Sequence, residues 1–284
     1  MTQSSRFVVS SEWLDRELGA PDLRIVDASF YLPAQQRNAE AEYAAGHIPG
    51  AVRFNHDAVA DHSSDLPHMV PSPEVFAEAV GRMGISESDR IVIYDGPGIF
   101  SAPRGWWLFR IMGAQNVFIL DGGLDGWKAE GRPLETDVPA PAPALFNPAF
   151  RPEKVIDLDT MKAIVDARSI QVADARSAAR FTAAEPEPRQ GLRAGHMPGA
   201  KNLPSSLFST NGKLKPMPEL RRILEDAGLD LGRPVVTSCG SGITAAIITL
   251  ALESLGHQDN ALYDGSWTEW GGRSDTSVVA GSDD

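Results

Sequence analysis

The feature that most constrains the fold of this chain is an internal duplication. Four blocks of the 284-residue sequence recur in the same order, at offsets between 143 and 149 residues. The matching blocks are 25–28 with 172–175, 45–51 with 194–200, 91–96 with 235–240, and 120–127 with 263–270. Because a repeat at a nearly fixed period indicates a repeated architecture, we expect two copies of one folding unit.

A proline-rich stretch marks the junction between the copies. Pro139, Pro141 and Pro143 alternate with alanines. Proline cannot donate ladder hydrogen bonds, and such a run favours an extended polyproline II conformation, which suits a semi-rigid linker. We therefore predict a first domain over residues 1–138 and a second over residues 150–284.

Within each unit, short apolar runs alternate with stretches of helical spacing. The predicted strands are 23–26, 91–94, 117–120, 171–173, 235–238 and 260–263. The predicted helices include 73–83, with Ser72 as its N-cap, and 218–227. Buried strands that alternate with helices indicate a parallel sheet flanked by helices, so the predicted fold class is α/β in both units.

Composition excludes several classes of function. The formal net charge is −12, which removes the basic footprint of a nucleic-acid-binding protein. No apolar run approaches the roughly 18 residues of a membrane span, and the first residues lack the pattern of a signal peptide. One cysteine allows neither an internal disulfide nor a thiolate metal cluster. The histidines show no metal-binding spacing and no nucleotide-binding loop is present. We therefore expect a cytoplasmic protein without metal or cofactor.

The single cysteine lies in a glycine-rich turn. Cys239 directly follows the predicted strand 235–238 and precedes Gly240-Ser-Gly-Ile-Thr and a helical run. Glycines allow successive backbone N–H groups to point at one site, and a helix N-terminus adds a partial positive charge. Both effects favour the thiolate, so we interpret Cys239 as a nucleophile rather than as an inert, buried cysteine.

The duplication contains its own comparison for this loop. The residue of the first copy that matches Cys239 is Asp95, in the sequence Tyr94-Asp95-Gly96. A carboxylate can fill an anion-binding loop but cannot form a persulfide. We therefore predict that the second copy is catalytic and that the first is supportive.

These motifs resemble those of tandem rhodanese-type sulfurtransferases. The resemblance covers residues from about 10 to 272 and implies two rhodanese-like domains. The loop that follows Cys239 is similar to the Cys-Gly-[Ser/Thr]-Gly-Val-Thr loop of 3-mercaptopyruvate sulfurtransferases. Thiosulfate sulfurtransferases usually carry Cys-Arg-Lys-Gly-Val-Thr instead. The active-site loop of this chain has no cation: it consists of Gly240, Ser241, Gly242, Ile243 and Thr244.

The resemblance also implies residues that bind the substrate. Arg180 and Arg189 match two arginines that 3-mercaptopyruvate sulfurtransferases use for the carboxylate and carbonyl groups of the donor. A guanidinium suits this task, because it binds a carboxylate as a charged fork. The alternative is that both arginines form surface ion pairs of little energetic value. Arg176 follows Asp174 closely and is expected to pair with it locally.

Two further residues are candidates for catalysis. Ser241 either relays a proton or simply favours the turn through local backbone bonding. The resemblance implies that a histidine of the first domain completes a Cys/Ser/His arrangement, and we assign it to His47. The alternative is a role in the fold, because His196 repeats His47 in the second copy.

The implied activity is transfer of the sulfur of 3-mercaptopyruvate through a Cys239 persulfide, with release of pyruvate. Thioredoxin, small thiols or cyanide are the implied acceptors. The alternatives are a thiosulfate sulfurtransferase, or a non-catalytic sulfur-carrier or regulatory module that binds anions.

Overall fold

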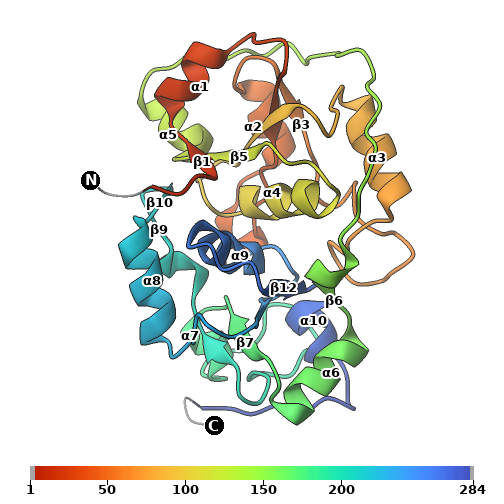
Figure 1. Ribbon diagram of the computed structural model, residues 1–284, viewed down its shortest axis with the longest axis vertical. Coiled ribbons are helices and arrows are strands. Elements are labelled where there is room, and N and C mark those ends of the chain that lie inside the picture. Colours follow the sequence, from red (N-terminus) through yellow and green to blue (C-terminus); the bar gives the residue numbers. More distant parts are fainter. Residues whose placement is uncertain (1–3, 282–284) are drawn as a thin grey trace.

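The computed structural model describes residues 4–281, which form two five-stranded sheets with identical strand order (Figure 1). The first sheet has the order β1-β5-β4-β2-β3, and all its strands are parallel. Its elements are β1 (Val8–Val9), α1 (Ser11–Glu17), β2 (Leu23–Asp27), α2 (Ala39–Ala45), β3 (Ala51–Arg53), α3 (Pro73–Arg82), β4 (Arg90–Tyr94), α4 (Ala102–Ile111), β5 (Val117–Leu120) and α5 (Gly123–Ala129).

The second sheet repeats this arrangement with the order β6-β12-β11-β7-β8, again parallel throughout. Its elements are β6 (Val155–Ile156), α6 (Leu158–Ala167), β7 (Gln171–Asp174), α7 (Ala178–Phe181), β8 (Lys201–Asn202), α8 (Met217–Asp226), β11 (Val235–Ser238), α9 (Ala245–Ser254), β12 (Asn260–Tyr263) and α10 (Ser266–Trp270). The antiparallel hairpin of β9 (Ser209–Thr210) and β10 (Lys213–Leu214) lies between β8 and α8.

The predicted α/β class and duplication are confirmed, and the sequence patterns place the central elements well. The six predicted strands correspond to β2, β4, β5, β7, β11 and β12. Helix α3 begins after Ser72, whose side chain accepts a hydrogen bond from the Val75 N–H as predicted for an N-cap. The short edge strands β1, β3, β6 and β8 and the hairpin were not predicted, because two or three residues carry no readable periodicity.

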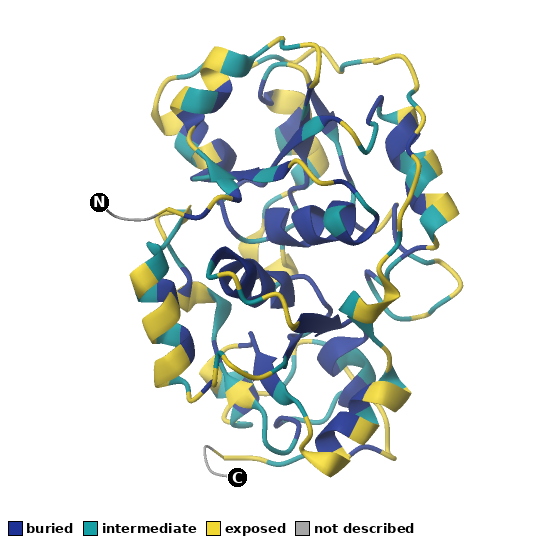
Figure 2. Ribbon diagram, in the orientation of Figure 1, coloured by how far each residue is buried: buried dark blue, intermediate teal, exposed yellow. Residues whose placement is uncertain are grey.

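The two halves meet along a pair of buried helices, α4 and α9 (Figures 1 and 2). Every residue of α9 is buried, and α4 leaves only Arg110 partly exposed. Their side chains join one hydrophobic cluster that extends through both halves. Since burial of apolar surface is the main favourable term in association, this seam is expected to hold the halves as one body.

The halves also exchange loops reciprocally. The loop between β3 and α3 reaches the second half, where the Val70 N–H donates to Asp264 at 2.7 Å. The β9–β10 hairpin reaches the first half, where the Leu214 N–H donates to Asp121 at 2.8 Å. Asp121 and Asp264 stand at matching positions after β5 and β12. Each half therefore contributes a loop to the other at the same place.

The proline-rich linker runs along the outside of the first half (Figure 1). Residues 138–151 form neither helix nor strand, and the Ala144 N–H donates to the Gly81 carbonyl oxygen at 2.9 Å near the end of α3. The predicted domain ends at residues 1 and 284 lie outside the described residues, so the domain bounds stay a prediction. Within residues 4–281, no helix is long and apolar enough to cross a membrane.

Candidate active site

Cys239 lies at the carboxyl end of β11, where the chain turns into α9. The residue is 1% exposed. Its N–H donates to the Ser266 hydroxyl at 3.3 Å, and its carbonyl oxygen accepts from the Trp267 N–H at 2.9 Å. These bonds fix the backbone of Cys239 to the start of α10 without using the thiol. The sulfur is therefore held at the strand end where open α/β sheets form ligand sites.

The loop after Cys239 offers a set of unused hydrogen-bond donors. Within the described part of the chain, the N–H groups of residues 240–245 have no acceptor. In the first half, the matching loop is filled by the carboxylate of Asp95, which is fully buried. That carboxylate accepts hydrogen bonds at 2.6–2.9 Å from the N–H groups of Gly98, Phe100, Ser101 and Ala102.

The two loops share a glycine of positive φ three residues after Asp95 and three residues after Cys239. Gly98 and Gly242 have φ of +78° and +80°, values that favour glycine. Burial raises the pKa of Asp95, and the four N–H donors oppose that shift. Because four N–H groups of the first loop hold the carboxyl oxygens of Asp95, the second loop is expected to bind an anionic group carried by Cys239 or its substrate.

The two predicted substrate-binding arginines meet over Gly240. A Cβ atom added at Gly240 would lie 3.2 Å from Nη2 of Arg180 and 4.0 Å from Nη1 of Arg189. The Gly240 carbonyl oxygen is held by Thr268, which donates to it through its N–H and hydroxyl. A glycine at this position therefore lets both guanidinium groups approach the loop closely.

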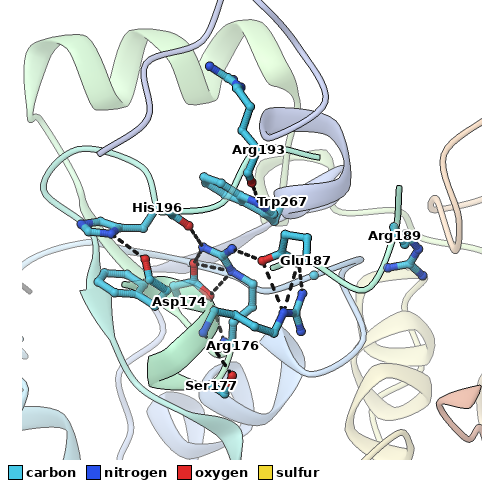
Figure 3. Close-up of polar contacts among 12 residues, drawn as sticks. Asp174, Arg176, Ser177, Glu187, Arg189, Arg193, His196 and Trp267 are labelled. Carbon is cyan, nitrogen blue, oxygen red and sulfur yellow. Dashed lines mark hydrogen bonds and ion pairs between the residues drawn. The ribbon is translucent and has the colours of Figure 1, made fainter. Parts of the chain in front are cut away.

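The three arginines near the loop, Arg176, Arg180 and Arg189, differ in how far neighbouring carboxylates neutralise their charges. Figure 3 shows Arg176 between Asp174 and Glu187, with its guanidinium 4.0 Å above the ring of Trp267. Arg180 shares Glu187, whereas Arg189 has no carboxylate within 4.0 Å among residues 4–281. Within the described residues, Arg189 forms one hydrogen bond, a long contact of 3.4 Å to the Thr268 hydroxyl. The predicted local pairing of Arg176 is confirmed, and Arg189 supplies the uncompensated positive charge beside the loop.

Ser241 belongs to the same loop, two residues after Cys239. Its side chain is 9% exposed, and no described residue accepts from or donates to its hydroxyl group. The hydroxyl is therefore available to a substrate, although its role in the reaction stays a prediction.

The structure does not bring His47 to the Cys239 loop. Its ring is stacked on Tyr43 at 4.0 Å, and its Nδ1 lies 2.8 Å from the Tyr43 carbonyl oxygen. Its backbone pairs with Glu135. His196 makes the same contacts in the second half, with Phe181 and Val279. In each half, the repeated histidine thus links a helix, through Tyr43 or Phe181, to the last segment of that half, at Glu135 or Val279. We therefore withdraw a direct catalytic role for His47.

The first-half histidine at the site is His68, which the sequence analysis missed. It precedes Val70 by two residues on the loop that docks against Asp264. Its Nδ1 lies 2.9 Å from Oδ1 of Asp57, and both ring nitrogens are buried without a hydrogen-bond partner among the described residues. Burial lowers the pKa of His68 to about 4, which Asp57 opposes and the charges of Arg104 and Arg189 assist. The imidazole is therefore neutral at neutral pH.

A signal for His68 was present in the duplication. Val70 matches Leu214 because both donate to the equivalent aspartates, so His68 matches Gly212. A histidine that has no counterpart in the other half is a better candidate than a repeated one. Among the described residues, no group of three or more His, Cys, Asp or Glu side chains could hold a metal ion.

Comparisons with known proteins place both halves in one family. The model of the rhodanese-like domain matches residues 10–130 and 157–273. The chain is 43% identical to the 3-mercaptopyruvate sulfurtransferase of Escherichia coli K12, over 97% of this chain and 98% of that protein. It is 39% identical to the thiosulfate sulfurtransferase of Gallus gallus, over 93% of each chain. The crystal structure of SseA, a 3-mercaptopyruvate sulfotransferase from Escherichia coli, matches with a TM-score of 0.85 and 41% identity, over 92% of this chain and 98% of that one.

Proposed function

This chain belongs to the rhodanese-like family and is a sulfurtransferase, and we propose that its sulfur donor is 3-mercaptopyruvate. The observation that carries this proposal is the charge balance above the Cys239 loop. Arg176 and Arg180 share the charges of Asp174 and Glu187, which leaves Arg189 as the uncompensated cation. One free positive charge suits the single carboxylate of 3-mercaptopyruvate better than the two charges of thiosulfate.

The proposed reaction begins with the thiolate of Cys239. It attacks the sulfur of 3-mercaptopyruvate, while Arg189 and Arg180 hold the carboxylate and carbonyl groups of the donor. The sulfur–carbon bond breaks, and its electron pair stays on carbon as the enolate of pyruvate. Cys239 then carries an outer S–H group, whose proton passes to the enolate carbon. The products are pyruvate and an anionic persulfide, which the N–H groups of residues 240–245 stabilise.

We assign the transfer of this proton to Ser241 and His68. We take the neutral imidazole with its proton on Nδ1, the nitrogen 2.9 Å from Asp57, which leaves Nε2 unprotonated. That nitrogen can accept a proton from the persulfide, directly or through the Ser241 hydroxyl, and return it to the enolate. This assignment replaces the one to His47, which the family resemblance implied.

In the second half-reaction, an acceptor thiolate attacks the outer sulfur and restores Cys239. Thioredoxin, small thiols and cyanide stay the proposed acceptors, and ping-pong kinetics are expected. A cytoplasmic location also stays a proposal, which cell fractionation would check.

The donor is tested by intact-protein mass after the purified protein is mixed with 3-mercaptopyruvate or thiosulfate. We expect a gain of about 32 Da from 3-mercaptopyruvate and little from thiosulfate, with return to the starting mass after a small thiol is added. Gain from thiosulfate alone would support the alternative donor. No gain from either would contradict the proposed activity and support a module that only binds anions.

Replacing Arg189 with glutamine tests the charge argument separately. Removing charge-assisted bonds worth about 1.5–3 kcal/mol is expected to lower kcat/KM for 3-mercaptopyruvate by about 10- to 100-fold, mainly through KM. Steady-state kinetics measure this change. The matched control is Arg273→Gln, because Arg273 pairs with Asp275 on the exposed surface. An unchanged KM in Arg189→Gln would remove this residue from the donor site.

A further inference from the structure

Arg104 is a fully buried cation in the seam between the two halves. It lies in the first turn of α4 and has no exposed surface. Its guanidinium lies 4.6 Å from the centre of the Trp107 ring and forms an ion pair with Asp264 at 2.7 Å. A buried charge is costly even when paired, so its presence here calls for an explanation beyond stability.

The guanidinium connects three separate parts of the candidate site. Nη2 donates to the carbonyl oxygen of His68 at 2.6 Å and to Asp264. Nη1 donates to the carbonyl oxygen of Gly242 in the cysteine loop at 3.4 Å. His68 belongs to the first half, and Gly242 belongs to the second. One rigid, planar group therefore spans the proposed proton carrier and the loop of the nucleophile.

The contact of Arg104 with Gly242 also affects the orientation of the N–H donors in the Cys239 loop. A Cβ atom at Gly242 would lie 3.0 Å from Nη1 of Arg104, so the close approach is possible because this residue is glycine. The Gly242 carbonyl shares a planar peptide unit with the N–H of Ile243. Fixing the direction of the carbonyl therefore fixes the direction of an N–H donor in the loop.

The duplication separates this role from simple docking of the halves. The contact of Val70 with Asp264 has an exact counterpart in that of Leu214 with Asp121. The counterpart of Arg104, however, is Ile247, because α4 and α9 begin at Ala102 and Ala245. Among the described residues, the matching contact with Asp121 has no buried cation in the place of Arg104, and the cation near it, Lys213, has an exposed side chain. The buried cation stands beside the loop that carries the cysteine.

We propose that Arg104 is a positioning residue, which holds His68 and the Cys239 loop at the separation that proton transfer requires. This role rests on the proposed function, because it concerns the same site. Arg104 does not touch the donor in this account and acts through the carbonyl groups of His68 and Gly242. Its loss should therefore slow the chemical step and leave donor binding nearly unchanged.

The variants are chosen so that folding and positioning can be told apart. Arg104→Lys keeps the charge but loses the planar fork. Arg104→Met combined with Asp264→Asn removes both charges, so that no unpaired carboxylate stays buried. The matched control is Arg110→Met, because Arg110 lies on the same helix and pairs across the seam with Glu253 at 2.8 Å. None of its described contacts reaches the Cys239 loop.

The measurement is the rate of persulfide formation at saturating 3-mercaptopyruvate, followed by rapid quenching and intact mass, together with KM and the urea midpoint. We expect the double variant to load sulfur about 10- to 100-fold more slowly than the wild type, with KM little changed. Arg104→Lys should be intermediate, and Arg110→Met should load at the wild-type rate even where its urea midpoint falls.

Three results would overturn the role of Arg104 while leaving the proposed function in place, of which the first two concern the rate of loading. One is loading of the Arg104 variants at the wild-type rate, and the other is an equal loss in Arg110→Met. An effect confined to KM would likewise contradict positioning. Failure of the wild-type protein to load any sulfur would instead overturn the proposed function, and this role with it.

Discussion

Replacing Cys239 with serine is expected to abolish sulfur transfer and to leave the fold intact. The hydroxyl cannot form a persulfide, so turnover should fall by about 10⁴-fold or more, as for other removed nucleophiles. The fold should persist because the bonds of residue 239 to Ser266 and Trp267 use only backbone atoms. Steady-state turnover and intact mass after exposure to 3-mercaptopyruvate measure the loss, and the urea midpoint measures stability.

Because the chain has a single cysteine, a mass gain can be assigned to Cys239 without ambiguity. With no second thiol in the chain, a mass gain of one sulfur in the variant would have to come from adventitious attachment. The wild-type protein treated in parallel provides the positive control. Near-normal turnover in Cys239→Ser would exclude covalent transfer through this residue and, with it, the proposed mechanism.

Replacing His68 with glutamine is expected to lower kcat for 3-mercaptopyruvate by about 10²- to 10³-fold, since general acid–base transfer contributes on this scale. Glutamine is of similar size and leaves the backbone carbonyl that Arg104 binds. Its amide cannot carry a proton, so the loss should appear in kcat rather than in KM. Stopped-time product assays for pyruvate measure it.

The control for this variant is His47→Gln. Both histidines are buried in the first half, but His47 is stacked on Tyr43 and ties down Glu135. His47→Gln should lower the urea midpoint and leave kcat close to that of the wild type. The opposite pattern, with kcat lost in His47→Gln and retained in His68→Gln, would restore the assignment to His47 that the family resemblance implied.

The low pKa of His68 also gives the direction of a pH effect. Burial, the main cause, lowers that pKa to about 4, below the ordinary value of about 6.5. The imidazole therefore stays neutral, and able to accept a proton, as the pH falls from 7 to about 5. Activity that depends on this group should decline only as the pH approaches 4, and the decline should be absent in His68→Gln.

The sequence predicts the parts of this protein that are either local or repeated. The buried runs 91–94 and 235–238 identify central strands, and the glycine-rich turn identifies Cys239 as the residue of interest. Arg180 and Arg189 were assigned through a family resemblance, and the structure brings both to Gly240. Each of these inferences depends on a short stretch of chain or on a whole-chain pattern.

The sequence does not predict which residues of the two halves contact each other. Arg104 and Gly242 are 138 residues apart, and nothing in the sequence near either one indicates that they meet. His47 was chosen because it belongs to a recognisable block, but a residue retained in both copies serves what both copies share, which is the fold. The residues that differ between matching positions are the informative ones: Cys239 against Asp95, His68 against Gly212, and Arg104 against Ile247.

The carboxylate of Asp95 acts as a covalently attached ligand of the loop to which it belongs. Its effective concentration at the first loop far exceeds that of any anion free in solution, so it will not be displaced by sulfate, phosphate or a sulfur donor. Although the chain has two anion-binding loops, we therefore expect it to bind one free anion or one sulfur donor per molecule. The Asp95 loop is therefore always occupied and keeps one conformation. The Cys239 loop, in contrast, gains and loses its anionic group in each reaction cycle.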